Sequence, residues 1–267
     1  MKTISKLYIA LIMVFLYAPI LVMVLFSFNS SNSTAVFEGF SLKWYYELIK
    51  NESVLVSLSN TLILAFLSAI IATVIGSAAA VGICSYRKKW AKSALMSVTN
   101  IPMMNPDIVT GISMMLLFVF FGRMLALRNS LSFVTLLIAH ITFNLPYVIL
   151  SVLLKLRQTD SHLSEAALDL GCTPVKAFFK VVLPSISSGI LTGFIMAFTL
   201  SLDDFVISYF TTGPEFQTLP LLIYSMTKRR VTPDMYALST LMFVSVLVLL
   251  ILFNIAQSRA DGKKKVR

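Results

Sequence analysis

Two adjacent carboxylates, Asp203 and Asp204, lie in an otherwise apolar stretch of this 267-residue sequence. A charged carboxylate costs about 2.5–3.5 kcal/mol at the centre of a membrane helix, so a pair of them needs a function or a compensating partner. Phe205 and Tyr209 follow closely, and carboxylates beside aromatic rings suit a cation that must shed its water. The sequence therefore predicts that these four residues line a pathway for a cationic ligand.

The two carboxylates cannot both face the same group, because adjacent residues of a helix point about 100° apart. We expect Asp203 to face the pathway, while Asp204 caps an unwound turn or pairs with a basic residue such as Lys228. A second interpretation places both at the outer membrane interface, near water, where they serve only as a helix end.

Another segment predicts two short helices joined by a bend. The apolar residues of the first helix recur at helical spacing and form one stripe: Leu163, Ala166, Ala167 and Leu170. Asp160 is placed to cap this helix, Gly171 suits the left-handed residue that ends it, and Thr173 can cap a second helix. Pro174 fits the first position of that second helix, and Leu183-Pro184 closes it. Helices this short are not stable alone in water, so we expect them to dock on a larger partner, although an ordinary surface loop would share the pattern.

The elements that position these residues are membrane-spanning helices. The chain is 57% hydrophobic and only 13% charged, with a mean hydropathy of +0.86, and a soluble domain of that composition would expose too much apolar surface. We predict an all-α membrane protein with a single transmembrane domain over residues 1–267 and a cytoplasmic loop at 155–184. Its six spans are expected at about 7–28, 61–86, 105–121, 131–154, 185–210 and 236–256.

The distribution of Lys and Arg predicts that both termini are cytoplasmic. Of the 22 Lys and Arg residues, 15 lie at the two termini, after the second span or in the loop at 155–184, and the outer loops hold 7. Basic residues concentrate on the cytoplasmic side of membrane proteins, so this distribution indicates the orientation. The basic cluster at 228–230 falls on the outer side in this scheme and has no assigned role.

Several functions are excluded or disfavoured. The net charge of +10 does not indicate binding to nucleic acid, because the basic residues flank apolar spans. The sequence contains no phosphate-binding loop, no cluster of His and Cys metal ligands and no convincing nucleophile-base arrangement. His140 has no acidic residue at i±3 or i±4 in its own span, which favours a hydrogen-bonded histidine over a proton relay. We therefore expect a translocation subunit without catalytic residues, metal or cofactor of its own.

The helix-bend-helix segment resembles the EAA loop of ABC-transporter permeases. The resemblance lies in Glu165-Ala166-Ala167, in Gly171 four positions later and in the closing Leu183-Pro184. Nearly the whole chain is similar to the C-type permease of the spermidine/putrescine ABC importers. The similar segments outside the loop are Pro19 with Phe28-Asn29-Ser30, 104–109, 140–143, 200–204, 212–214 and 219–221.

This resemblance implies a type I ABC importer fold in the bacterial inner membrane. It implies as partners a second, homologous permease, two ATPase subunits that bind ATP and Mg, an extracytoplasmic polyamine-binding protein and the polyamine itself. In this family the EAA loop inserts into a cleft of the ATPase subunit and passes its motion to the membrane helices. The residues that would couple to the ATPase are then Glu165, Ala166, Ala167, Gly171, Leu183 and Pro184.

The sequence is also compatible with other transport functions. A sister importer for ferric iron, phosphonate or thiamine would carry the same loop, because the loop contacts the ATPase and not the cargo. The acidic pair favours a cationic cargo over phosphonate. An ion-coupled secondary transporter using His140 and the acidic pair would predict an internal inverted repeat, which we do not find, and would leave the helix-bend-helix segment unexplained.

Overall fold

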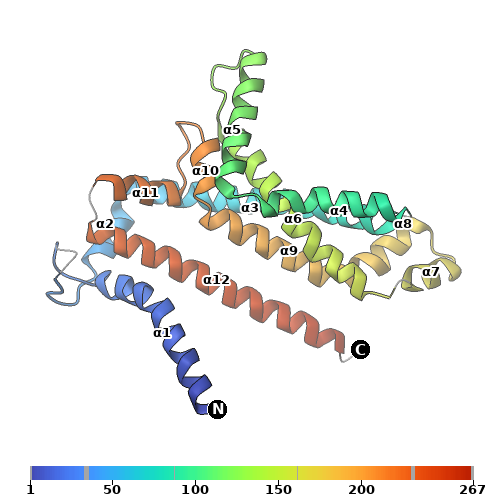
Figure 1. The fold of residues 1–267 in the computed structure, drawn as a ribbon, viewed down its shortest axis with the longest axis horizontal. Coiled ribbons are helices and arrows are strands. Elements are labelled where there is room, and N and C mark those ends of the chain that lie inside the picture. The colour runs from blue at the N-terminus through green and yellow to red at the C-terminus, as the bar shows by residue number, and fades with distance from the viewer. Residues whose placement is uncertain (1, 33–35, 87, 161, 230–231, 266–267) are drawn as a thin grey trace. The chain divides into compact units, whose positions relative to one another are not determined.

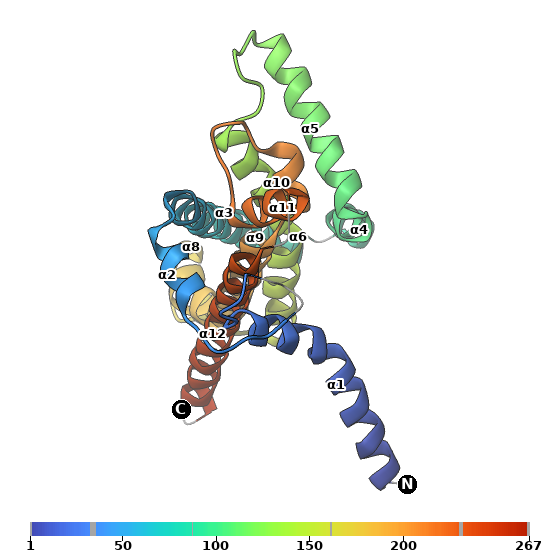
Figure 2. The ribbon, with the colours of Figure 1, turned by 90° about the vertical axis from the view of Figure 1, so that its left-hand side faces the viewer.

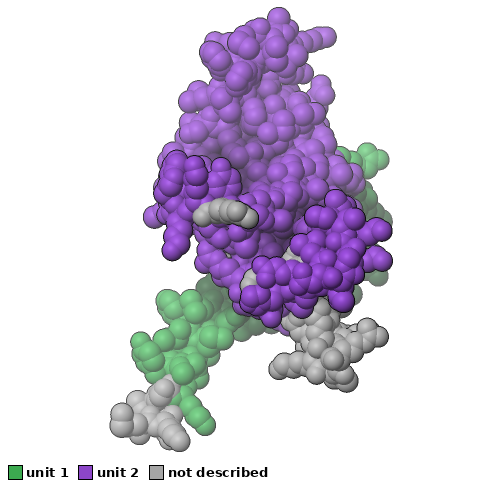
Figure 3. All heavy atoms as spheres, turned by 90° about the vertical axis from the view of Figure 1, so that its right-hand side faces the viewer, with its two compact units in different colours: residues 1–58, 219–249 green, residues 59–218, 250–267 purple. Residues whose placement is uncertain are grey.

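A computed structural model of the chain describes residues 2–32, 36–86, 88–160, 162–229 and 232–265. Over these residues the regular secondary structure is helical, and an isolated bridge joins Asn29 and Phe40. The chain divides into two compact units, residues 1–58 with 219–249 (unit 1) and residues 59–218 with 250–267 (unit 2), which Figure 3 shows in different colours.

Six helical segments are long and apolar enough to cross a membrane, as the sequence predicts. They are α1 (Lys2–Phe26), α3 (Glu52–Ser85), α5 (Asp107–Met124), α6 (Phe133–Gln158), the continuous segment from Pro174 to Asp203, and α12 (Pro233–Lys265). Each of them overlaps one expected span, and each reaches the length of about 17–25 residues that crosses the hydrocarbon core. The membrane boundaries themselves stay a prediction.

Unit 1 has its own apolar core. It contains α1, α2 (Lys43–Lys50), the first turns of α3, α11 (Leu219–Arg229) and α12 as far as Leu249. The buried residues of this core are Trp44, Leu48, Val54, Leu219, Ala237 and Leu238. The indole Nε1 of Trp44 donates a hydrogen bond to the carbonyl oxygen of Asn29 (2.7 Å), so this large side chain is buried without an unpaired donor.

The basic cluster at 228–230 lies at the end of α11, in unit 1. The Nζ atom of Lys228 lies 4.6 Å from the ring centroid of Tyr224, which is a cation–π contact. Arg230 lies outside the described residues. The cluster therefore keeps no assigned role.

Unit 2 is built on α6 and α9 (Leu183–Asp203), which lie side by side (Figures 1 and 2). Two glycines of α9 allow this close approach. A Cβ atom at Gly189 would lie 2.5 Å from Cβ of Lys155, and one at Gly193 would lie 3.2 Å from Cγ1 of Val148. A Cβ at Gly76 of α3 would lie 2.7 Å from the same Val148 atom. Small residues therefore set the spacing of these helices.

The helix-bend-helix segment forms as predicted, beyond the ends of α6 and α9 (Figure 1). Its elements are α7 (His162–Asp169), the bend, α8 (Pro174–Ala177) and η1 (Phe178–Val182). Gly171 has a left-handed φ of +81°, and the Cys172 amide donates to the carbonyl oxygen of Ala167 (3.1 Å), which closes the end of α7. The hydroxyl of Thr173 caps α8 by accepting a hydrogen bond from the Lys176 amide (3.4 Å).

One expectation for this segment is wrong, because Leu183-Pro184 does not end the second helix. Helix α8 continues through η1, a single π-helical turn, directly into α9. The amide of Leu183 bonds to the carbonyl oxygen of Phe178, five residues earlier. This wider turn accommodates the proline ring, which would clash with the carbonyl four residues earlier in a regular helix.

The segment expected as the fifth span, 185–210, does not form one continuous helix. The helix breaks at Asp204, whose backbone is extended (φ −63°, ψ 126°), and α10 (Val206–Thr211) follows. Helix α10 packs against α5, where a Cβ at Gly111 would lie 2.9 Å from Cδ2 of Phe210. Helices α4 (Lys89–Met104) and α11 are not expected from the sequence, since both are too polar for hydropathy to identify them as spans.

Candidate functional site

The break between α9 and α10 separates the two carboxylates. Asp203 is the last residue of α9, and it is exposed. The side chain of Asp204 is only 7% exposed and accepts hydrogen bonds from the amides of Ile207 (3.2 Å) and Ser208 (2.8 Å). These amides belong to the first turn of α10, where no intrahelical acceptor is available to them. Of the two roles that the sequence predicts for Asp204, these bonds support the cap.

His140 of α6 completes the surroundings of Asp204. Its imidazole is buried, and Nε2 lies 3.5 Å from Oδ2 of Asp204. The ring also forms hydrogen bonds with the hydroxyls of Ser201 through Nδ1 (3.1 Å) and Ser208 through Nε2 (3.0 Å). These bonds confirm the predicted hydrogen-bonded histidine. The acidic neighbour comes from a different segment, which a search limited to one helix does not find.

Asp203, Phe205 and Tyr209 remain candidates for contact with a cargo. Tyr209 is 45% exposed, and its ring centroid lies 5.5 Å from that of Phe205. Among the residues that the structure describes, Asp203 has no basic side chain within ion-pair distance. A carboxylate followed by aromatic side chains offers an organic cation both a negative charge and ring faces. The described part of the chain contains no group of three or more His, Cys, Asp or Glu side chains that could hold a metal ion.

The first helix of the helix-bend-helix segment carries an exposed carboxylate that pairs with a histidine. Glu165 of α7 accepts a hydrogen bond from Nδ1 of His162 (3.1 Å), and both side chains are largely exposed. This bond, together with the negative charges of Asp160 and Glu165, raises the pKa of His162 above its ordinary value of 6.5. The hydrogen bond to Glu165 therefore favours the protonated form of His162.

The bend presents apolar side chains to the surroundings. Ala167 of α7 and Ala177 of α8 are buried within the segment. Three neighbouring apolar residues are 86%, 66% and 60% exposed, respectively: Leu170, Val175 and Phe179. Exposed apolar residues gathered in this way are typical of a protein–protein contact. Ala166 is exposed beside them, whereas Leu183 and Pro184 lie at the start of α9.

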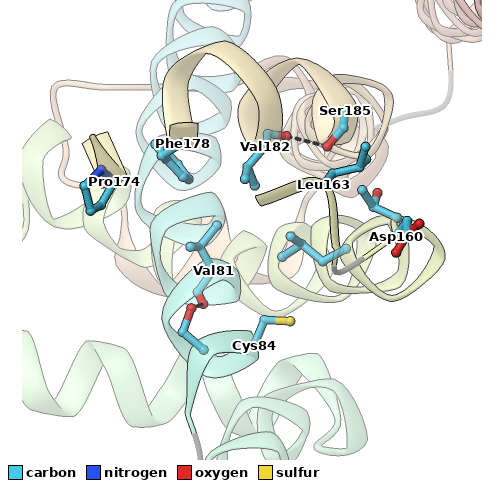
Figure 4. A pocket seen from close by; sticks show the side chains of 11 residues that line it. Val81, Cys84, Asp160, Leu163, Pro174, Phe178, Val182 and Ser185 are labelled. Atoms are coloured by element: carbon cyan, nitrogen blue, oxygen red, sulfur yellow. Dashed lines mark hydrogen bonds between the residues drawn. The ribbon is translucent and has the colours of Figure 1, made fainter. Parts of the chain in front are cut away.

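A pocket of about 320 Å³, partly open to the surface, lies beside the helix-bend-helix segment, within unit 2. Its walls are the last turn of α3, the end of α6 with the turn that follows it, and the continuous helix from α8 to α9. Figure 4 shows Phe178 and Val182 on one side of this space and Val81 and Cys84 on the other. This pocket therefore separates Phe178 and Val182 from the end of α3.

Comparison with known proteins shows extensive similarity. The sequence profile of the family described as "Binding-protein-dependent transport system inner membrane component" matches residues 72–266. The putrescine transport system permease protein PotI of Escherichia coli K12 is 36% identical over 253 residues, which cover 95% of this chain and 90% of that protein. The spermidine/putrescine transport system permease protein PotC of the same organism is 40% identical over 249 residues, which cover 93% of this chain and 92% of that protein.

A solved structure shares the fold of this chain. It is the crystal structure of a bacterial ABC transporter involved in the import of the acidic polysaccharide alginate. One of its chains superposes with a TM-score of 0.75 and 16% sequence identity, over 97% of this chain and 94% of that chain. At this level of identity the likeness concerns the fold alone.

Proposed function

This chain belongs to the family of binding-protein-dependent transport system inner membrane components, and we propose that it is a permease subunit of an ABC transporter that imports polyamines. It has the all-α, type I importer fold of ABC permeases. The observation that carries the cargo class is the identity of 36–40%, over 93–95% of this chain, to two permeases whose names specify putrescine or spermidine and putrescine.

The cargo contacts that we propose are Asp203, Phe205 and Tyr209. A polyamine carries several ammonium groups, and these must leave water before the molecule can cross an apolar pathway. The exposed carboxylate of Asp203 offsets part of this desolvation, and the aromatic rings add cation–π attraction. Asp204 supports the pathway without touching the cargo, because its side chain is buried and caps α10.

Coupling to ATP hydrolysis is proposed to pass through the bend between α7 and α8. Two ATPase subunits supply the hydrolysis, and Glu165 and the exposed apolar residues of the bend dock on them. A second, homologous permease completes the pathway, and an extracytoplasmic binding protein delivers the polyamine. Both termini lie in the cytoplasm, in agreement with the distribution of Lys and Arg.

Uptake of labelled polyamine tests this function. Bacterial cells without other polyamine importers receive the partner subunits together with this chain, without it, or with it and an ATPase subunit that cannot hydrolyse ATP. Labelled putrescine or spermidine is expected to accumulate only when both this chain and the active ATPase are present. Unlabelled thiamine, ferric iron and phosphonate serve as competitors. Uptake that does not depend on this chain, or that thiamine or ferric iron abolishes, would contradict the polyamine assignment.

A further inference from the structure

A buried polar network surrounds the break between α9 and α10. Its members are His140 and Asn144 of α6, Ser201 of α9, Ser208 of α10 and Ser68 of α3. Each of them is at most 2% exposed. Buried polar groups are costly unless they are paired, so a network of this kind favours one geometry over all others.

His140 contacts the chain on both sides of the break and within it. Nδ1 meets the hydroxyl of Ser201 before the break (3.1 Å), and Nε2 meets the hydroxyl of Ser208 after it (3.0 Å). Nε2 also lies 3.5 Å from Oδ2 of Asp204, inside the break. The imidazole ring is rigid and its nitrogens point in different directions, so it holds the end of α9 at a defined distance from the start of α10.

Asn144 strengthens this connection one helical turn further along α6. Residues four apart lie on the same face of a helix, so Asn144 follows His140 toward α9. Its Nδ2 donates to the hydroxyl of Ser201 (2.7 Å), which also lies 2.8 Å from the hydroxyl of Ser68. A hydroxyl offers one donor and two acceptor positions, and these neighbours together with His140 use all three of them. The end of α9 is therefore held by both α6 and α3.

We propose that His140 is a positioning residue for transport. By bonding to both sides of the break, His140 keeps Asp204 inside the helix bundle and Asp203 exposed. This inference builds on the proposed contact between Asp203 and the cargo, while His140 itself does not touch the cargo. Without the imidazole, Asp204 loses a polar neighbour and the two helix ends lose their common anchor. Asp204 is then held only by the cap that it forms on α10, the end of α9 loses its link to that cap, and the position of the adjacent Asp203 changes.

The first experiment measures the position of residue 203 without any cargo. The complete transporter is assembled with a chain that carries Asp203→Cys together with Cys84→Ser and Cys172→Ser, which leaves a single thiol in this chain. His140→Leu is expected to change the rate of modification by a water-soluble thiol reagent about fivefold or more, because thiol reactivity follows exposure. His140→Gln retains a donor and an acceptor and is expected to stay within about twofold of the parent rate. Equal rates in the parent and His140→Leu chains would overturn the proposal.

A packing control separates positioning from general destabilisation. Leu153 is also buried in α6 (2% exposed) but belongs to no part of the polar network. Leu153→Ala is expected to lower the amount of assembled complex, since it leaves a cavity, without changing the thiol rate of the complexes that remain. A thiol rate that changes equally in Leu153→Ala and His140→Leu would also overturn the proposal.

The second experiment measures polyamine uptake per assembled complex. His140→Leu is expected to reduce uptake about tenfold or more, since small misplacements of a contact group have effects of this size, and His140→Gln to recover most of it. In an Asp203→Asn background, His140→Leu should cause no further loss, because both changes act on the same contact. A multiplicative loss in that background would contradict the proposed positioning role. If the native chain carries no polyamine but the thiol rates shift as expected, the proposed function fails and the positioning role of His140 stands.

Discussion

Replacement of Gly171 tests whether the bend between α7 and α8 links ATP hydrolysis to transport. Gly171 has φ +81°, and a Cβ atom built on it meets no other atom within 4 Å. A substitution therefore changes the backbone energy of the bend and creates no steric clash. The left-handed conformation costs an L-residue about 1–2 kcal/mol, which lowers the population of the native bend about 5- to 30-fold relative to other conformations.

Three variants of Gly171, which differ in how readily they adopt the left-handed conformation, are expected to differ in uptake in the same order. Asn adopts the left-handed conformation more readily than other L-residues, and β-branched Val adopts it least readily. Polyamine uptake is therefore expected to decrease in the order Gly171, Gly171→Asn, Gly171→Ala and Gly171→Val, with almost no uptake for Val. Uptake and ATP hydrolysis are measured on the same proteoliposomes and normalised to assembled complex. The spans should stay inserted, because the strain is confined to the bend.

Cys172→Val is the matched control for this series. It introduces the same side chain one residue later, where the backbone does not have a positive φ. We expect Cys172→Val to transport at close to the native rate. Gly171→Val transporting as well as Cys172→Val would refute the argument that the left-handed bend is required for coupling.

Four further predictions follow from the same structure. Glu165→Lys should abolish uptake with the spans still inserted, because it reverses the charge on the exposed face of α7; normal assembly and uptake would disprove docking through α7. Asp203→Asn should cut uptake strongly while ATP hydrolysis persists, and unchanged uptake would show that Asp203 has no cargo role. Asp204→Ala should reduce the amount of assembled complex, since loss of a helix cap costs about 0.5–2 kcal/mol, and normal assembly would contradict its capping role. Cys172 should react with an impermeant thiol reagent from the cytoplasmic side, and labelling from outside intact cells would contradict the orientation. The pKa of His162, measured by NMR, should lie above 6.5 and return toward that value in Glu165→Gln. The stability that the His162–Glu165 pair adds to α7 is fully present below pH 6.5 and is lost as the pH rises through the raised pKa.

Local rules of the sequence determined the apolar helices and the bend. Whether a helix can cross a membrane depends on its number of consecutive apolar residues, which tertiary contacts do not change. The bend depends on a left-handed glycine and a capping hydroxyl that lie close together in the chain. Gly171 and Thr173 could therefore be identified from the sequence, and the structure confirms both.

Local rules did not predict the structure at Leu183-Pro184, where the helix continues. Proline is tolerated in the first turn of a helix and also commonly follows the end of one, so this dipeptide is compatible with a stop and with a start. The chain uses a π turn to connect α8 to α9, and α9 then packs against α6. The sequence around the proline contains no signal for that packing.

Only the tertiary structure decided which carboxylate of the acidic pair is buried. Asp203 and Asp204 have the same chemistry and adjacent positions, so no local rule distinguishes them. The groups that hold Asp204 come from α6 and from α10, and no sequence pattern places His140 beside the break. A carboxylate is stable in an apolar interior only when polar groups surround it, and here the imidazole that helps to do so is contributed by a distant segment of the chain.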